Sequence, residues 1–207
     1  MIKGKKVFFR AVGRTDLRLL ADWANAPDIS HLVVGWSFPI SMAAQEEWYL
    51  RSLNDTSTQR FIVESQNKDE GVIGLTGLWH IDWHNRNALT ALKLGPQAVR
   101  GKGYGTDAIL TMMSYAFFNV GLHRLWGAIL PYNVASYRAY VGKCGWKVEG
   151  MLREEVFRDG RYSDLYRVGV LRDDVLDHPF FKEYVPESYR GAAADRVEVQ
   201  DEHRIRF

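Results

Sequence analysis

The chain has 207 residues, of which 46% are hydrophobic and 25% are charged, and 27 basic against 25 acidic residues leave a net charge of +2. This near balance argues against direct nucleic-acid binding, which needs a basic excess to displace counterions. The single cysteine, Cys144, excludes an internal disulfide and a cysteine-rich zinc site. Because no signal peptide or membrane span is visible, we expect a cytoplasmic protein without a membrane partner.

The spacing of apolar residues predicts alternating strands and helices. In chain order these are a strand over 5–12, a helix from residue 14 with Leu17, Leu20 and Trp23 on one face, a helix over 41–53 capped by Ser41, strands over 60–65, 72–81 and 88–94, a helix over 107–120, a strand over 122–130, a helix over 134–144, and strands over 146–157 and 162–171 that form a hairpin around Asp159-Gly160. After Leu171 the pattern weakens and predicts a loosely packed tail, with a late edge strand over 196–207.

A glycine-rich turn over 100–106, between a predicted strand and the strongest predicted helix, is the most informative part of the sequence. Glycines let backbone amides approach a ligand, and the N-terminus of the following helix offers unpaired N–H groups and a positive dipole end. The turn therefore predicts a phosphate or pyrophosphate site, and the alternative is a plain tight turn. Rossmann spacing fails at Thr106, and Walker spacing fails at Gly103.

The same turn resembles a known family. Arg100, Gly103 and Gly105 form Arg-x-x-Gly-x-Gly, which is similar to the acetyl-CoA pyrophosphate loop of the GNAT N-acetyltransferase superfamily. Residues 145–153 resemble the Gly-Phe-x-x-Glu-Gly-x-Leu-Arg signature of the RimJ/RimL-like branch, and 159–164 match the Asp-Gly-x-x-x-Asp hairpin that follows it. The resemblance covers roughly residues 5 to 172, and the predicted order of elements is also the order of that superfamily.

The resemblance implies an α/β fold with a mixed central sheet, splayed at the cofactor site, and helices on both faces. Acetyl-CoA would lie between two parallel strands over 90–94 and 125–130, where the backbone N–H of Leu94 meets the thioester carbonyl. Asn133 opens the next helix where the family has an Asn that bonds the pantetheine arm. The cofactor-binding residues implied in this way are Leu94, Arg100, Gly101, Lys102, Gly103, Tyr104, Gly105, Thr106, Asn133 and Ser136.

Tyr140 is a candidate for stabilising the departing thiolate. Many family members place a Tyr seven residues after that Asn, and Tyr140 stands two helical turns below Asn133. Gly145, however, falls one residue later than the family spacing, so the extra residue can turn Tyr140 toward the sheet. Two roles therefore remain open for Tyr140: a hydrogen-bond or proton donor to the sulfur, or an aromatic side chain that packs.

This sequence lacks the glutamate that some members of the family carry on the strand before the Asn, because Ala128 stands at that position. His80 and Asp82 are candidate catalytic residues, since they alternate with His84 at the end of a strand, near the expected acceptor entrance. The alternative is an exposed hairpin tip. Three such residues without further ligands do not predict a metal site. Further candidates for the base are Glu149 and Glu154.

These observations predict an acetyl-CoA-dependent N-acetyltransferase in residues 1–172 and a C-terminal extension in residues 173–207. By resemblance to the branch, the acceptor is a primary amine such as a protein N-terminus. The alternatives are a small-molecule amine (a polyamine, an antibiotic or an amino sugar) or a CoA-binding module without catalysis. The expected oligomeric state is a monomer or a homodimer.

Overall fold

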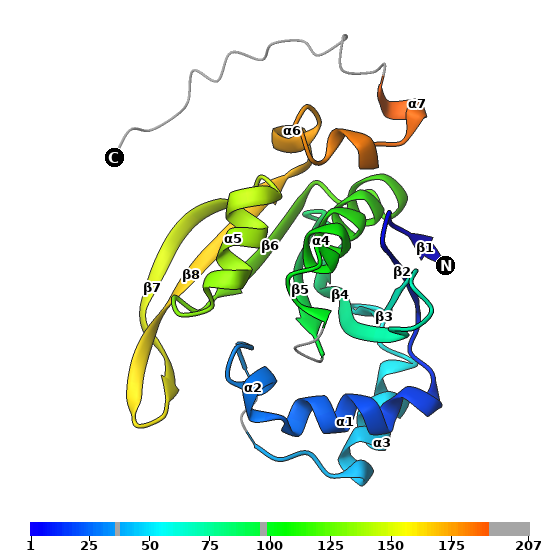
Figure 1. Ribbon diagram of the computed structural model, residues 1–207. Helices are drawn as coiled ribbons and strands as arrows, with labels where there is room; N and C mark the ends of the chain where they lie inside the picture. Colours follow the sequence, from blue (N-terminus) through cyan, green and yellow to red (C-terminus); the bar gives the residue numbers. More distant parts are fainter. Residues whose placement is uncertain (36–37, 96–98, 191–207) are drawn as a thin grey trace.

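The computed structural model describes residues 1–35, 38–95 and 99–190 of the chain (Figure 1). Its elements in chain order are β1 (Ile2–Lys3), β2 (Val7–Ala11), η1 (Arg14–Asp16), α1 (Leu17–Asn25), α2 (Pro27–Ser30), α3 (Met42–Ser52), β3 (Gln59–Ser65), β4 (Val72–Asp82), β5 (Asn87–Leu94), α4 (Tyr104–Ser114), η3 (Tyr115–Asn119), β6 (Arg124–Ile129), α5 (Val134–Lys143), β7 (Lys147–Arg158), β8 (Arg161–Leu171), α6 (Arg172–Val175), η4 (Lys182–Tyr184) and α7 (Glu187–Arg190).

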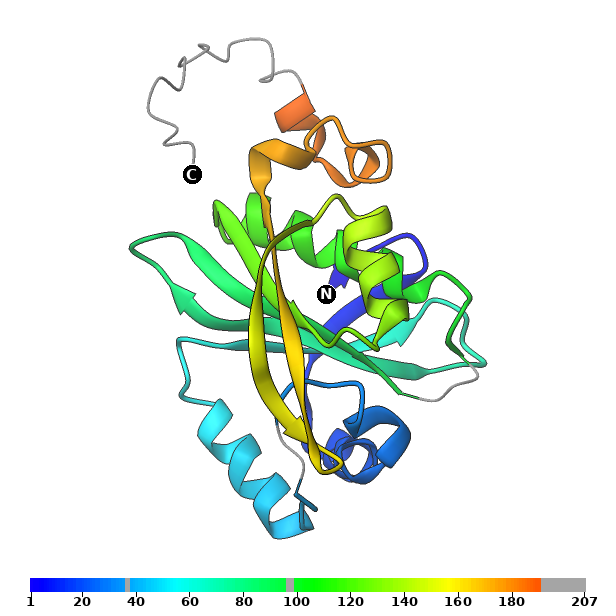
Figure 2. The ribbon, with the colours of Figure 1, turned by 90° about the vertical axis from the view of Figure 1, so that its left-hand side faces the viewer.

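Eight strands of the described residues form one sheet in the order β1-β2-β3-β4-β5-β6-β8-β7, in which β5 and β6 run parallel. Helices α4 and α5 cover one face, and α1 and α3 cover the other (Figure 2). The two parallel strands pair only where β5 residues 87–89 lie opposite β6 residues 124–126. The rest of β5 stays paired with β4, and the rest of β6 with β8, so the sheet opens between them. The predicted α/β architecture with a splayed mixed sheet is confirmed.

Local chemistry explains why most predicted elements form where they do. Helix α1 buries the face predicted from its spacing, Leu17, Leu20 and Trp23. The Ser41 hydroxyl caps α3 by accepting a hydrogen bond from the Ala44 N–H at 3.2 Å. At the tip of the β7–β8 hairpin, residues 159 and 160 both have positive φ, of 52° and 76°, as a two-residue type I′ turn requires.

The helix predicted over 107–120 begins three residues earlier, at Tyr104. Its N-cap is Gly103, whose φ of 86° lies in the left-handed region. The turn, rather than the apolar periodicity, therefore sets the start of α4. As a result, the free N–H groups of the first helical turn directly follow the glycine-rich loop. A π-helical turn, η3, continues the helix to Asn119.

The expectation of a loosely packed segment after Leu171 is wrong for residues 172–190. Val175 and Phe181 are fully buried, and Val185 is nearly so. The Phe181 ring meets the Phe117 ring edge-on and stacks on the Phe118 ring, both in η3. Isolated apolar residues in short turns have no periodicity, so the sequence pattern does not reveal this packing. The strand predicted over 196–207 lies outside the described residues.

A buried carboxylate, Asp107, joins the first turn of α4 to both ends of the described chain. It accepts hydrogen bonds from the backbone N–H groups of Lys5, Lys6 and Val7 at 3.0, 2.7 and 2.9 Å, and from the Tyr184 hydroxyl. Asp107 therefore holds the start of the helix that follows the glycine-rich loop.

Candidate active site

A cleft of about 440 Å³ lies at the end of β5 that diverges from β6, beside the glycine-rich loop, α4 and α5. It reaches both faces of the sheet, because α4 and α5 line one side and α2 with the residues after it lines the other. Eight of the ten residues predicted to bind the cofactor line this cleft, and so does Tyr140. These residues are Leu94, Arg100, Gly101, Gly103, Gly105, Thr106, Asn133, Ser136 and Tyr140. The structure thus brings together a set that the sequence spreads over 47 positions, from 94 to 140.

The glycine-rich loop presents backbone rather than side chains to the cleft. Gly101 and Gly103 have φ values of 79° and 86°, which L-residues with a side chain rarely adopt. Gly105 has room for a β-carbon, which would lie 3.5 Å from Leu94 Cδ1. The loop and the N-terminus of α4 therefore offer the free N–H groups that an anion site needs. Gly103 has the strictest need for glycine, because a β-carbon there would also lie 3.3 Å from Lys6 Nζ, whereas one on Gly101 would meet nothing within 4 Å.

The open edge of β5 supplies further donors. Gly95 N–H donates to Ile73 O of β4 at 2.9 Å, and Leu94 pairs with Gly74. Because N–H groups alternate in direction along an antiparallel ladder, the N–H groups of Leu92 and Leu94 point away from β4 and into the opening. This is the position expected of a donor to the thioester carbonyl, and that role of Leu94 remains a proposal.

Asn133 has a structural use that the sequence analysis did not anticipate. Its side-chain oxygen caps α5 by accepting from the Ser136 N–H at 3.1 Å, and its amide nitrogen donates to Leu32 O at 3.0 Å. Residues 30–33 are also held by Arg158 of β7, which donates to Ser30 O, His31 O and Val33 O at 3.2, 2.6 and 3.1 Å. Residues 29, 32 and 33 in turn line the cleft, so α5 and the β7–β8 hairpin together position one of its walls.

Tyr140 faces the cleft and also packs in the core. Its ring meets the Trp146 ring edge-on at 4.9 Å, and it lines the cleft. The extra residue before Gly145 is absorbed at the end of α5, where the Cys144 N–H bonds both Ala139 O and Tyr140 O and the Trp146 N–H returns to Tyr140 O. The insertion therefore does not turn Tyr140 away from the cleft. Burial raises the pKa of the Tyr140 phenol, so the side chain stays a proton donor at neutral pH.

Cys144 is fully buried, and burial raises the pKa of its thiol to about 12. A thiol that stays protonated is a poor nucleophile, which agrees with direct attack by the acceptor rather than a cysteine acyl-enzyme.

The charge of the cleft suits acetyl-CoA. Four basic side chains line it, and among the described residues no carboxylate does; the four are Lys93, Arg100, Arg138 and Lys143. Phosphate and pyrophosphate groups need such cations together with free N–H groups, and both are present. Sequence reasoning missed Arg138 and Lys143. Lys143 could have been predicted from helical spacing, because it lies seven residues after Ser136 on the same face of α5.

Two residues predicted to bind the cofactor do not bring their side chains to the cleft. The ammonium group of Lys102 pairs with Glu70 Oε1 at 2.6 Å, outside the cleft, because the flanking left-handed glycines turn it outward. The side chain of Tyr104 is buried in the core at the start of α4. Only the backbone of these two positions remains available to a ligand.

His80 and Asp82, predicted to lie near the acceptor entrance, are not among the residues that line the cleft. The ladder between β4 and β5 shifts between Trp79 and Asp82, and His80 has a φ of 51°, so the alternation with His84 breaks. Asp82 accepts from the Asn85 N–H and side-chain amide, both at 2.7 Å. Asp82 pairs with Asn87 at the far end of β5, seven residues or roughly 23 Å along the strand from Leu94. The described residues hold no group of three His, Cys, Asp or Glu arranged for a metal.

The two glutamates named as further candidates also have other contacts. Glu149 forms a bidentate ion pair with Arg124, one bond being 2.5 Å long. Glu154 is exposed, and its backbone N–H donates to Asp164 Oδ1 at 2.9 Å. Glu149 is therefore part of the framework between β6 and β7.

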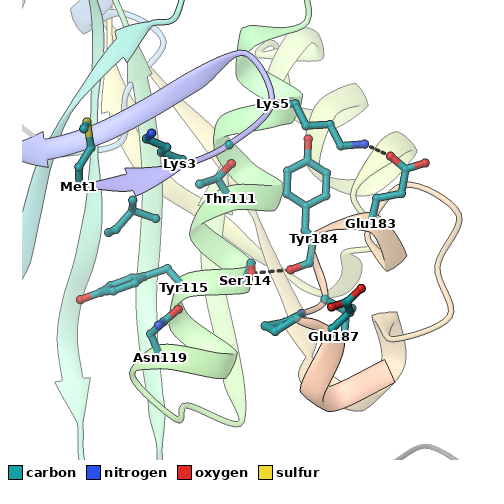
Figure 3. A pocket seen from close by; sticks show the side chains of 14 residues that line it. Met1, Lys3, Lys5, Thr111, Ser114, Tyr115, Asn119, Glu183, Tyr184 and Glu187 are labelled. Atoms are coloured by element: carbon teal, nitrogen blue, oxygen red, sulfur yellow. Dashed lines mark hydrogen bonds and ion pairs between the residues drawn. The ribbon is translucent and has the colours of Figure 1, made fainter. Parts of the chain in front are cut away.

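A second cavity, of about 680 Å³, lies between the N-terminal strand, α4 with η3, and residues 183–187 (Figure 3). Lys5 forms an ion pair with Glu183 at its rim, and the Ser114 hydroxyl donates to Tyr184 O at 2.6 Å. None of the residues that line the cleft borders this cavity. It arises where the C-terminal segment packs beside the N-terminus.

Replacing Gly103 by Val is expected to weaken acetyl-CoA binding about tenfold or more, equivalent to ~1.4 kcal/mol, because the loop can no longer hold its left-handed conformation. The matched control is Gly71→Val, since Gly71 has a φ of 56° in open space at the β3–β4 turn. Both variants should lose about 1–2 kcal/mol of stability. Calorimetric titration with acetyl-CoA should show lost affinity for Gly103→Val alone, and equal affinities would exclude this loop as the pyrophosphate site.

Comparisons with known proteins agree with this geometry. A model of the acetyltransferase (GNAT) domain family matches residues 6–147. Similar proteins include two spermidine N(1)-acetyltransferases. The one from Vibrio cholerae serotype O1 is 30% identical over 81% of this chain and 94% of its own. The one from Escherichia coli K12 is 29% identical over 85% and 91%. A crystal structure of spermidine N-acetyltransferase from Vibrio cholerae, in complex with CoA and spermine, has a TM-score of 0.76 at 29% identity, covering 83% of this chain and 98% of that one. No helix of the described residues is long and apolar enough to cross a membrane.

Proposed function

The chain belongs to the GNAT acetyltransferase family, and from that premise we propose that it acetylates a polyamine. It is an N-acetyltransferase that uses acetyl-CoA as cosubstrate. The observation that carries the acceptor class is the similarity over most of both chains to spermidine N-acetyltransferases. It favours a small-molecule amine over the protein N-terminus that the RimJ/RimL-like signature suggested.

The chain's own residues account for the main steps of transfer. Arg100, Arg138 and Lys143 bind the phosphate groups, together with the amides of the glycine-rich loop. The N–H of Leu94 donates to the thioester carbonyl and stabilises the oxyanion that forms during attack. Tyr140 donates a hydrogen bond or its proton to the sulfur as the thiolate leaves. The amine attacks from the side of α2, where the cleft opens on the other face of the sheet.

A polyamine needs anionic contacts beyond the cleft, since no carboxylate among the described residues lines the cleft itself. The β7–β8 hairpin supplies them, because it carries a set of carboxylates at its exposed end: Glu154, Glu155, Asp159 and Asp164. The hairpin reaches the cleft wall through Arg158, and Asp159 lies 3.3 Å from the His31 ring nitrogen. The ammonium groups of an extended polyamine can thus be held outside while one amine enters.

An acceptor screen tests this function. We expect spermidine and spermine to release CoA thiol from acetyl-CoA with a higher kcat/KM than amino sugars or peptides with free N-termini. Mass spectrometry should detect the acetylated product in the same amount as the thiol released.

Reversing the charge of the hairpin with Glu154→Lys and Glu155→Lys should raise KM for spermidine without changing the affinity for acetyl-CoA, because only the acceptor contacts these residues. A preference for N-terminal peptides would replace the polyamine with the protein acceptor of the RimJ/RimL-like branch.

A further inference from the structure

Lys93 lies within the opening of the sheet and points to its acceptor side. Its neighbours Leu92 and Leu94 face α4, since a β-carbon on Gly105 would lie 3.9 and 3.5 Å from their side chains. Alternation along the strand sends Lys93 to the opposite face. Gly95 lies two residues after Lys93 and so faces the same side of the sheet, where a β-carbon on Gly95 would collide with the Trp23 ring of α1. Lys93 therefore extends toward α1 and α2 from the strand segment whose free N–H groups face the thioester.

The surroundings of Lys93 disfavour its charged form. It is partly buried in a cleft wall that also contains the apolar side chains of Ile29, Leu32 and Val33. Its ammonium group has no hydrogen bond or ion pair within the described part of the chain. Burial lowers the pKa of Lys93.

The charged groups around the cleft also disfavour a charged Lys93. Arg100 of the loop and both Arg138 and Lys143 of α5 add positive charge to the same cleft. Asp28 of α2 does not line the cleft, and its carboxylate lies 3.8 Å from the Arg100 guanidinium. A neutral amine beside a bound thioester is a nucleophile.

We propose that Lys93 is an internal acetyl acceptor, which this enzyme acetylates when no external amine occupies the cleft. The Nζ lone pair of the neutral amine attacks the thioester carbonyl carbon of acetyl-CoA and forms the C–N bond. The C–S bond then breaks, and its electron pair leaves with the CoA sulfur. The proton lost by Nζ passes to that thiolate, so the products are Nε-acetyl-Lys93 and free CoA. The inference rests on the acetyl-CoA-dependent transfer, but not on the identity of the external acceptor.

Acetylation of Lys93 would regulate the same site. The acetyl group adds bulk to the acceptor side of the cleft, and it converts the Lys93 amine to an amide that cannot be protonated. The modified enzyme should keep its affinity for CoA, whose phosphates contact other residues, and should turn over external amines more slowly.

Mass spectrometry of the full-length protein, incubated with acetyl-CoA at pH 8 without an acceptor, tests the proposal. We expect the wild type to gain one acetyl group and peptide mapping to place it on Lys93. An exposed lysine with a pKa near 10.4 is neutral in only about 0.4% of molecules at pH 8, so Lys93 should react roughly tenfold faster or more. The rate of Lys93 acetylation should rise with pH and become constant at a lower pH than the acetylation rate of exposed lysines. Saturating spermidine should protect Lys93.

Two variants make the outcome decisive. Lys93→Arg keeps a cation but should lose the modification, whereas Lys68→Arg, at an exposed turn outside the cleft, should retain it. Equal acetylation of the Lys93→Arg protein, or acetyl groups spread evenly over exposed lysines, would overturn the proposal. An enzyme that acetylates spermidine but never Lys93 refutes this inference alone. Acetylation of Lys93 without turnover of any polyamine refutes only the proposed acceptor.

Discussion

Replacing Tyr140 by Phe is expected to lower kcat by about 10²- to 10⁴-fold, the range typical of a lost general acid, with little change in acetyl-CoA affinity. The Phe ring preserves the edge-on contact with Trp146, so only the hydroxyl is removed from the cleft. Steady-state kinetics with spermidine, together with calorimetric titration of CoA, measure both quantities. Burial raises the pKa of the phenol above its ordinary value of 10.0, so ionisation of Tyr140 should not lower kcat between neutral pH and pH 10.

Tyr137→Phe is the matched control for this prediction. Tyr137 belongs to the same helix, but it packs against Tyr166 at 6.0 Å and does not line the cleft. Its hydroxyl should be dispensable. Tyr140→Ala should also melt earlier, because it leaves a cavity beside Trp146. If the Tyr140→Phe enzyme turns over at the wild-type rate while Tyr140→Ala is unstable, Tyr140 serves packing alone and the proton reaches sulfur by another route.

Replacing Asp107 by Asn is expected to cost about 3 kcal/mol or more of the free energy of unfolding, because a buried, fully bonded carboxylate is converted to a group that cannot match its partners. One carboxylate oxygen accepts from Lys6 N–H and Val7 N–H, and the other from Lys5 N–H and the Tyr184 hydroxyl. In Asn one of these acceptors becomes an NH₂ donor that faces two donors. At about 2–4 °C per kcal/mol for a chain of this size, Tm should fall by roughly 6–12 °C.

Two further variants separate the network from ordinary surface effects. Tyr184→Phe removes a single hydroxyl and should cost only about 1–2 kcal/mol. Asp22→Asn breaks an exposed i,i+4 pair with Arg18 and should change stability by less than about 0.5 kcal/mol. Calorimetric melting of the three proteins should rank them Asp107, Tyr184, Asp22 in decreasing order of loss. An Asp107→Asn protein that melts with the wild type would mean that the carboxylate is not needed to hold the start of α4.

Features with a local physical cause could be predicted from the sequence alone. Gly103 needs a left-handed backbone, Ser41 caps the residues that directly follow it, and residues 159–160 have the composition of a two-residue turn. Each of these depends on atoms within a few positions along the chain. The order of elements and the glycine-rich loop followed from such signals, and the resemblance of that loop to the GNAT superfamily then implied the fold and the cosubstrate.

Other features depended on contacts between distant segments. A shift in the β4–β5 ladder breaks the alternation that placed His80 and Asp82 on one face, and the parallel pairing of β5 with β6 puts their tip at the closed end of the sheet. Divergence of the same two strands is also what exposes Lys93 inside the cleft, although nothing around position 93 in the sequence marks it as unusual. Burial, and therefore the protonation state of a side chain, is set by the segments that pack around it, which local sequence patterns do not encode.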